Sequence, residues 1–189
     1  MGRLLYSMQV SLDGYVQDPA GDFSWAAPEA GDHQAMNDAM SDVGTYLMGR
    51  RMYEMMHVWE TDPSIAEQGP EAAEFAQIWQ RADKIVFSTT LSDPITARTE
   101  LRRTFDPAEI RALKDASDED LTIDGPTLAA HALRHGLVDA VMPVIYPVSI
   151  GGGLRFLPDD LRLDLTLRRD RVVGRGIVFL EYDVVHARD

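Results

Sequence analysis

The sequence contains no cysteine, which excludes disulfide bonds, thiolate metal ligands and thiol nucleophiles at once. It also lacks the pattern of a signal peptide, because Leu4-Leu5-Tyr6 leads directly into a strand-like run. No apolar segment approaches the length needed to cross a bilayer, since residues 138–150 are interrupted by Asp139, Pro143 and Pro147. We therefore expect a cytoplasmic protein that does not bind membranes.

Positive charge is scarce as well. The chain has 18 Lys and Arg against 31 Asp and Glu, a net charge of -13. Nucleic-acid binding requires a cluster of basic side chains, so this balance argues against it. The pairs Arg102-Arg103 and Arg168-Arg169 alternate with strand-like residues, and we expect them on solvated edges. An anionic cofactor can still bind where a few arginines and backbone N–H groups converge.

With 189 residues, 45% of them hydrophobic, the chain fits a single domain covering residues 1–189. Strand-like and helix-like segments alternate along it, which predicts an α/β fold with a mostly parallel central sheet and helices on both faces. The tail predicts a C-terminal antiparallel strand pair. Strands are expected at Leu4–Val10, Thr45–Gly49, Lys84–Ser88, Thr99–Phe105, Leu121–Asp124, Val138–Val148, Leu163–Leu167 and Gly176–Val185. Helices are expected from Asp32 and at Arg51–Val58, Glu71–Arg81, Pro107–Lys114 and Leu128–His135.

Three short motifs fall at the carboxyl ends of expected strands, where sheets of this kind bind ligands. They are Gly49-Arg50, Ser88-Thr89-Thr90 and Gly125-Pro126-Thr127. A glycine lets a phosphate approach the backbone, and the helix that follows offers unpaired N–H groups. Each motif alone is equally typical of ordinary turn and capping residues.

In this order and spacing the motifs resemble the dihydrofolate-reductase-like superfamily, in particular the branch with the reductase domain of the bifunctional riboflavin-biosynthesis deaminase-reductase. Ser11-Leu12-Asp13-Gly14 resembles the first-strand motif of that family, and Leu47–Tyr53 resembles its M-G-R-x-T-[YW] segment. Lys84–Ser88 is similar to the strand that enters the 2′-phosphate pocket. Residues 121–153 follow the family's G-G-x-x-L…G-L-V-D…P…G-G-G pattern.

The resemblance implies an NADPH-dependent oxidoreductase, with NADH as the alternative cofactor, that reduces a small planar heterocycle or imine such as a pteridine or pyrimidine. It also implies a homodimer. The substrate would lie between residues 13–25 and the helix from Asp32. The residues that would line the dinucleotide are Gly49, Arg50, Ser88, Thr89, Gly125, Thr127 and Leu128.

The chain departs from the family motifs at three positions. Met52 stands where the motif has threonine, Thr89 where many relatives have arginine, and Asp124 where the first of two paired glycines is expected. A carboxylate there would face the cofactor's pyrophosphate with like charge unless its side chain turns away. The alternative hypothesis is a non-catalytic relative that binds a ligand or acts through dimerisation.

A reductase needs a proton source, and a carboxylic acid with a raised pKa is a common one. Asp13, at a junction of strand and loop, is the first candidate, although it is equally typical of a turn before a glycine. Asp32, Tyr15 and Trp25 are candidates for substrate binding. Asp32 would otherwise cap a helix, and the aromatic residues would anchor their loop to the core.

Two further groups of residues stand out. Six methionines grouped between Met36 and Met56 indicate an adaptable apolar surface, suited to a pocket wall, an interface or the core. His131 and His135 stand four residues apart on an expected helix, but no Glu follows His131 as in zinc-binding helices. We therefore expect no metal site.

Overall fold

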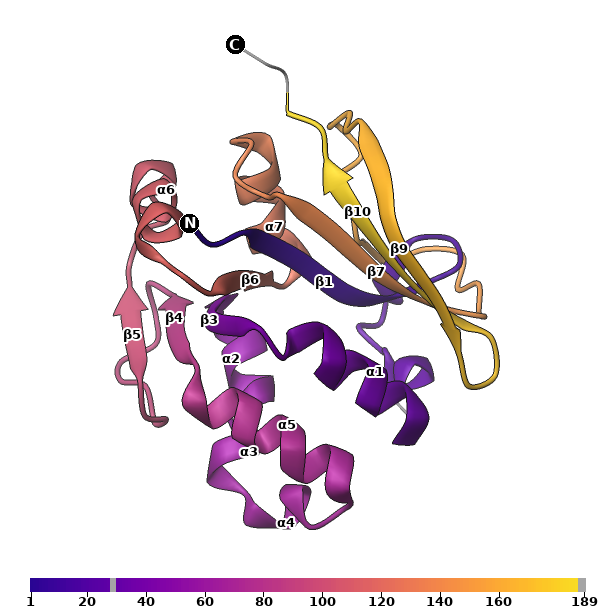
Figure 1. The fold of residues 1–189 in the computed structure, drawn as a ribbon, viewed down its shortest axis with the longest axis horizontal. Helices are drawn as coiled ribbons and strands as arrows, with labels where there is room; N and C mark the ends of the chain where they lie inside the picture. Colours follow the sequence, from indigo (N-terminus) through magenta and orange to yellow (C-terminus); the bar gives the residue numbers. More distant parts are fainter. Residues whose placement is uncertain (28–29, 187–189) are drawn as a thin grey trace.

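A computed structural model describes residues 1–27 and 30–186, which form one eight-stranded sheet covered by helices on both faces (Figure 1). The strand order is β5-β4-β3-β6-β1-β7-β10-β9. All neighbours are parallel except β10, which runs antiparallel to both β7 and β9. A separate antiparallel pair joins β2 to β8. The predicted parallel sheet with a C-terminal antiparallel pair is confirmed.

The elements have the following bounds. The strands are β1 (Leu4–Ser11), β2 (Tyr15–Gln17), β3 (Val43–Gly49), β4 (Asp83–Phe87), β5 (Thr99–Arg102), β6 (Asp120–Asp124), β7 (Ala140–Tyr146), β8 (Leu154–Arg155), β9 (Leu165–Val173) and β10 (Ile177–Val184). The helices are η1 (Ser24–Ala26), α1 (Ala30–Met40), α2 (Arg50–Met56), α3 (Val58–Thr61), α4 (Pro63–Ala66), α5 (Pro70–Arg81), α6 (Pro107–Ala116) and α7 (Pro126–Arg134). None of the helices in the described part of the chain is long and apolar enough to span a membrane.

Alternation along β1 gives the sheet its two apolar faces. Leu4 and Tyr6 point into a core shared with α6 and α7, whereas Leu5 belongs to a second core that includes Phe75 and Trp79 of α5. Figure 1 shows α6 and α7 on one side of the sheet and α1 to α5 on the other. A central strand with both faces covered is predominantly apolar, as residues 4–10 of the sequence are.

Local signals fix several element ends as expected. The Asp106 carboxylate accepts a hydrogen bond from the N–H of Ala108 at 2.8 Å, so it caps α6 with Pro107 in the first turn. Gly136 follows α7 with φ +61°, the left-handed conformation that commonly ends a helix.

Other boundaries differ from the sequence-based expectation. The helix expected at Arg51–Val58 is divided into α2 and α3, because the N–H groups of Glu60 and Thr61 bond back to the carbonyl of His57. The strand expected at Leu163–Leu167 instead spans Leu165–Val173, because β10 supplies hydrogen-bond partners along that whole length. The short elements β2, β8 and α4 were not anticipated, since two to four residues carry too little periodicity.

Tyr53 fixes the position of α2 against the loop that follows β4. Its hydroxyl is buried and accepts hydrogen bonds from the backbone N–H groups of Ile95 and Thr96, at 2.8 and 3.1 Å. The same hydroxyl lies 3.0 Å from the Thr96 hydroxyl.

We expect Tyr53→Phe to lower the free energy of unfolding by about 1–3 kcal/mol, because it leaves these buried N–H groups without an acceptor. Tyr182→Phe is the matched control, since the Tyr182 hydroxyl has no hydrogen bond to a described residue. Urea denaturation of both variants measures the difference. Equal stabilities would contradict the assigned role of Tyr53.

Candidate functional site

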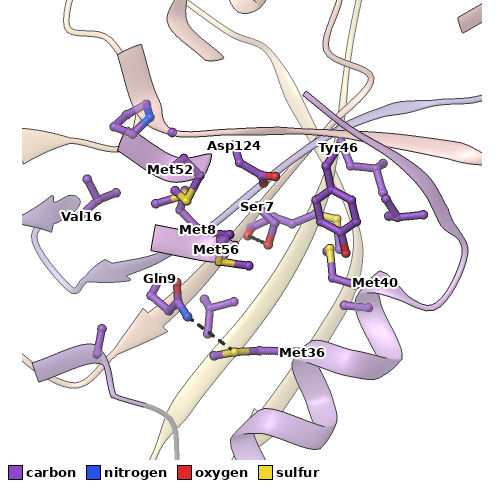
Figure 2. A pocket seen from close by; sticks show the side chains of 18 of the residues that line it. Ser7, Met8, Gln9, Val16, Met36, Met40, Tyr46, Met52, Met56 and Asp124 are labelled. Carbon is purple, nitrogen blue, oxygen red and sulfur yellow. Dashed lines mark hydrogen bonds between the residues drawn. The ribbon is translucent and has the colours of Figure 1, made fainter. Parts of the chain in front are cut away.

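A cavity of about 1180 Å³ lies between one face of the sheet and the helices α1 and α2. It is lined by residues of β1, β3, β6 and β7, by the segment that runs from β2 to η1, and by the starts of α2 and α7. Figure 2 shows polar side chains and methionines from these elements pointing into a common space. The cavity is the candidate binding site.

Strand register brings the ends of β3, β4 and β6 together beside this cavity. Gly49 of β3 pairs with Phe87 of β4, and Met48 pairs with Asp124 of β6. The helices α2 and α7 therefore start next to one another, with Gly49 and Gly125 as their N-cap residues. Neither N-terminus is capped by a side chain, so both present backbone donors.

The two glycines leave room for a ligand at these helix starts. A Cβ atom added to either Gly49 or Gly125 would meet no atom within 4 Å. Gly125 also has φ +93°, a conformation that other residues rarely adopt. An open glycine at an uncapped helix N-terminus suits the close approach of a phosphate group.

Five of the seven residues expected around the dinucleotide line the cavity: Gly49, Arg50, Gly125, Thr127 and Leu128. Ser88 and Thr89 are not among the described lining residues. The Ser88 hydroxyl instead accepts hydrogen bonds from the N–H groups of Thr90 and Leu91, at 3.2 and 2.9 Å, and so shapes the loop after β4.

That loop is nevertheless connected to the cavity wall. Arg50 donates to the Thr90 hydroxyl at 3.1 Å and forms an ion pair with Glu54 at 2.6 Å. Arg103 donates to the carbonyls of Ser88 and Leu91 at 2.9 and 2.6 Å. Arg103 is exposed just after the edge strand β5, as expected, but its contacts with this loop were not anticipated, because β5 is brought beside β4 only in the folded sheet.

Asp124 turns its side chain into the cavity (Figure 2). Its Oδ1 accepts a hydrogen bond from the Thr122 hydroxyl at 3.1 Å. Burial raises the pKa of the carboxyl from 3.8 to about 7, and the hydrogen bond from Thr122 opposes part of that rise. Near neutral pH the group is therefore about half protonated, which reduces the like-charge repulsion expected between Asp124 and a pyrophosphate.

Asp13 lies away from the described lining residues and holds two loops together. Its carboxylate accepts hydrogen bonds from the N–H groups of Ile150 and Gly151, at 3.2 and 2.7 Å. A hydrogen bond from the Ser11 side chain, aided by these two amides, holds the pKa of Asp13 well below its usual range. Its catalytic role stays a prediction, and these contacts favour an ionised anchor for the Gly151 turn.

The three residues predicted to bind substrate are likewise outside the described lining. Tyr15 stacks under Arg155 of β8, at 4.8 Å from its guanidinium carbon. Trp25 packs edge-on against Tyr146 with ring centroids 6.0 Å apart. Asp32 lies in the first turn of α1 rather than at its cap. Their roles in substrate binding stay predictions, while several of their sequence neighbours face the cavity: Val16, Gln17, Phe23, Ser24, Ala26, His33 and Met36.

Methionines make up much of the cavity wall. Seven of the nine line it: Met8, Met36, Met40, Met52, Met55, Met56 and Met142. Of the six methionines grouped in the sequence, Met48 is fully buried in the core. Of the three positions considered for these methionines, the pocket wall is therefore the one that the other five occupy. Met8 of β1 and Met142 of β7 join them, although nothing in the sequence predicts that these two lie near the others.

Metal ligands were not expected, and within residues 1–27 and 30–186 no three His, Asp or Glu side chains are grouped as a metal site requires. His131 packs against Phe105 instead, with ring centroids 6.3 Å apart.

Comparisons with known proteins agree with this architecture. The model of the family described as "RibD C-terminal domain" matches residues 3–179. The "Uncharacterized protein YyaP" of Bacillus subtilis is 24% identical over 184 residues, which cover 95% of this chain and 94% of YyaP.

Solved structures share the fold. A "Putative riboflavin biosynthesis protein" from Shewanella sp. PV-4 superimposes with a TM-score of 0.75 at 20% identity, covering 97% of this chain and 99% of that one. Dihydrofolate reductase from Enterococcus faecalis, complexed with NADP(H), has a TM-score of 0.59 at 13% identity and coverages of 97% and 96%. The fold is therefore dihydrofolate-reductase-like, as the sequence resemblance implied.

The raised pKa of Asp124 predicts a pH-dependent stability. Above about pH 4 the unfolded chain releases the proton that the folded protein keeps until about pH 7, so wild-type stability falls across that window. Asp124→Asn does not titrate. We expect its melting temperature, relative to that of the wild type, to rise between about pH 5 and pH 8. The corresponding gain in its free energy of unfolding relative to wild type is up to about 4 kcal/mol at the higher pH.

The exposed Asp118→Asn serves as the control and should show no such trend. Thermal unfolding of the three proteins at several pH values tests the prediction. A difference between Asp124→Asn and wild type that stays constant with pH would contradict it.

Proposed function

Because the chain belongs to the RibD C-terminal domain family, we propose that it is an NAD(P)H-dependent reductase of a small planar heterocycle or imine. One observation carries this proposal: two open glycines, at two uncapped helix starts, face a single large cavity that also holds a buried carboxyl. The helix starts can bind phosphates, the cavity has space for a ligand, and the carboxyl can supply a proton. A reduction of this kind requires all three in one place.

The residues present fit a dinucleotide. The helix starts at Gly49 and Gly125 offer N–H groups to its phosphates, and Thr127 adds an exposed hydroxyl beside them. Leu128 lines the same end of the cavity. When bound, a reduced nicotinamide dinucleotide supplies a hydride. The chain's part is to bind it and to hold the substrate against it.

NADPH is the proposed form, with NADH as the alternative. Arg50 is held beside the loop of Ser88, Thr89 and Thr90 by its hydrogen bond to Thr90. A guanidinium beside hydroxyl groups suits the additional phosphate of NADPH. Arg103 contacts the same loop through the carbonyls of Ser88 and Leu91, and it adds a second positive charge near position 89, where many relatives have arginine.

The reaction also consumes a proton, and we assign its delivery to Asp124 rather than to Asp13. Asp124 lies in the cavity and holds a proton near neutral pH. Asp13 is tied to backbone amides as a carboxylate, and its lowered pKa leaves it without a proton to give. Proton transfer would break the O–H bond of Asp124 and form the N–H bond of the product, and water would then restore the acid.

A homodimer is proposed for the assembly. β9 forms one edge of the sheet and exposes Leu165, Leu167 and Val172. An edge strand with exposed apolar side chains is a natural site for pairing with a second copy. Sedimentation velocity of the purified chain distinguishes a dimer from a monomer.

We expect the protein to bind NADPH in the micromolar range, with energy transfer from tryptophan to the nicotinamide as the readout. Gly49→Ala should weaken this binding about tenfold, because the added methyl group occupies the space left for a phosphate. Gly152→Ala is the control, since its Cβ would meet only Pro19 at an ordinary 3.8 Å. Failure of the wild type to bind either dinucleotide at millimolar concentration would refute the reductase and favour a non-catalytic relative.

Arg50→Gln should narrow the preference for NADPH over NADH about tenfold, by weakening NADPH binding while leaving NADH binding largely unchanged. Arg111→Gln provides a comparison, because Arg111 lies on α6 and donates to the carbonyl of His135. Titration of each variant with both cofactors gives the ratio. An equal loss for NADPH and NADH would show that Arg50 does not contact the 2′-phosphate.

A further inference from the structure

Three polar side chains from neighbouring strands share one wall of the cavity. Tyr46 of β3, Asp124 of β6 and Ser7 of β1 follow the strand order β3-β6-β1. The register pairs both Tyr46 and Leu5 with Thr122, so these three side chains point to the same face of the sheet. Ser7 and Asp124 stand two residues after Leu5 and Thr122, and because side chains alternate along a strand they point to that face as well. Figure 2 shows all three around the same space.

The Tyr46 hydroxyl is buried without a hydrogen bond to any described residue. The residue is only 3% exposed, yet it lines the cavity. A buried hydroxyl without a partner costs about 1–3 kcal/mol, so a ligand that supplies a partner to this hydroxyl would recover that free energy.

The other two groups keep hydrogen-bonding capacity as well. The Ser7 hydroxyl donates to the carbonyl of Met142 at 3.1 Å, which leaves its oxygen as an acceptor. Asp124 uses Oδ1 to accept from Thr122, and its Oδ2 has no hydrogen bond to a described residue. The cluster can therefore both donate to and accept from one edge of a ligand.

No cation keeps Asp124 ionised. Burial is the largest cause of its raised pKa, and Asp124 forms no ion pair with a side chain of the described part of the chain. Its charge in turn raises the pKa values of Tyr6 and Tyr46, after the larger effect of burial. The other ionisable side chains that line the cavity from the neighbouring helices and from β6 are Asp120 of β6, His33 and Asp38 of α1, and Arg50 and Arg51 of α2, and the charge of Arg81 of α5 acts on Tyr46.

Around this polar cluster the walls are apolar and adaptable. Met40, Met52, Met56 and Met142 surround it, and methionine packs against flat rings of varied outline. At the end of the cavity near α3 and α5, Trp59 packs edge-on against Phe75 with ring centroids 4.8 Å apart. These walls suit a ligand with a large apolar surface.

The arginines near α1 and β9 are already paired with carboxylates. Arg171 contacts Asp38 at 3.1 Å. Arg3, Arg168 and Arg169 surround Glu181 at 3.2, 3.7 and 4.0 Å. These pairs are partly exposed, and none of them includes Ser7, Tyr46 or Asp124, so that cluster offers no ion-pair partner to an anion and a ligand edge bound there needs no negative charge.

We propose that Ser7, Tyr46 and Asp124 bind the polar edge of an uncharged, planar and otherwise apolar molecule, with Asp124 donating a hydrogen bond to it. As a substrate site, this cluster rests on the reductase function proposed above and specifies its substrate class. The bound molecule would present an acceptor, such as a ring nitrogen or carbonyl oxygen, to Asp124 and a donor to Ser7. Tyr46 can serve either role.

Phenanthridin-6(5H)-one is a suitable probe, because it is planar, uncharged, fluorescent and carries one lactam edge. We expect the wild type to bind it at micromolar concentration without any dinucleotide. Because binding needs the protonated acid, its affinity should fall about thirtyfold between about pH 6 and pH 8.5. Binding that is absent, or independent of pH, would overturn the proposal.

Two variants attribute the effect to the cluster. Asp124→Asn should bind the probe with an affinity that no longer changes with pH, since an amide donates at every pH. Tyr46→Phe should weaken binding several-fold at both pH values while leaving the melting temperature of the ligand-free protein unchanged or higher, because the lost hydroxyl had no partner. Tyr182→Phe is the control. A pH dependence retained in Asp124→Asn would assign the titration to another group and overturn the proposal.

NADPH titration of the same samples separates the two proposals. If NADPH binds but the probe shows no dependence on Asp124, the reductase stands and the substrate site fails. If the probe behaves as expected while neither NADPH nor NADH binds, the site stands as a ligand site and the reductase fails.

Discussion

The structure depends on the parallel pairing of β3 with β4 on one side and β6 on the other. Because parallel strands end at a common edge, the pairs Gly49–Phe87 and Met48–Asp124 place three loops side by side. The helix starts, the loop of Ser88 to Thr90 and the Asp124 carboxyl all take their positions from this register. A slip of one residue would turn Tyr46 and Asp124 to the opposite face of the sheet.

The same sheet face supports two different environments. At the strand ends, glycines and helix starts provide backbone donors for an anion. A few residues further back, Tyr46 and Ser7 lie among methionines, where burial leaves the Asp124 carboxyl about half protonated near neutral pH. The two environments are therefore separate, and the proposed cofactor and the proposed uncharged ligand would each occupy one of them.

Asp124 departs from the family motif, and its position in the fold changes what this departure implies for ligand binding. On sequence grounds alone it opposes a pyrophosphate, because carboxylate and phosphate carry like charge. In the fold, its side chain points into the cavity toward Tyr46, and burial removes much of its charge near neutral pH. Asp124 therefore places in the cavity a titratable group that carries less than a full charge near neutral pH, as the proton delivery that we propose for it requires.

The sequence by itself determined the α/β class, the parallel sheet, the antiparallel tail and the family, because these depend on local periodicity and on motifs such as Leu47–Tyr53. Five of the seven residues that it predicted to bind a cofactor line the cavity, since glycines before helices are a local signal, and their role in binding stays a prediction. Only the tertiary structure decided which acid faces the cavity. Asp13 and Asp124 both stand at strand ends, and the difference lies in their neighbours. Backbone amides from residues 150–151 hold Asp13 as an anion, whereas burial raises the pKa of Asp124 to about 7. The sequence around a residue does not indicate hydrogen-bond partners that lie more than a hundred positions away. It also does not indicate whether packing will exclude solvent from that residue.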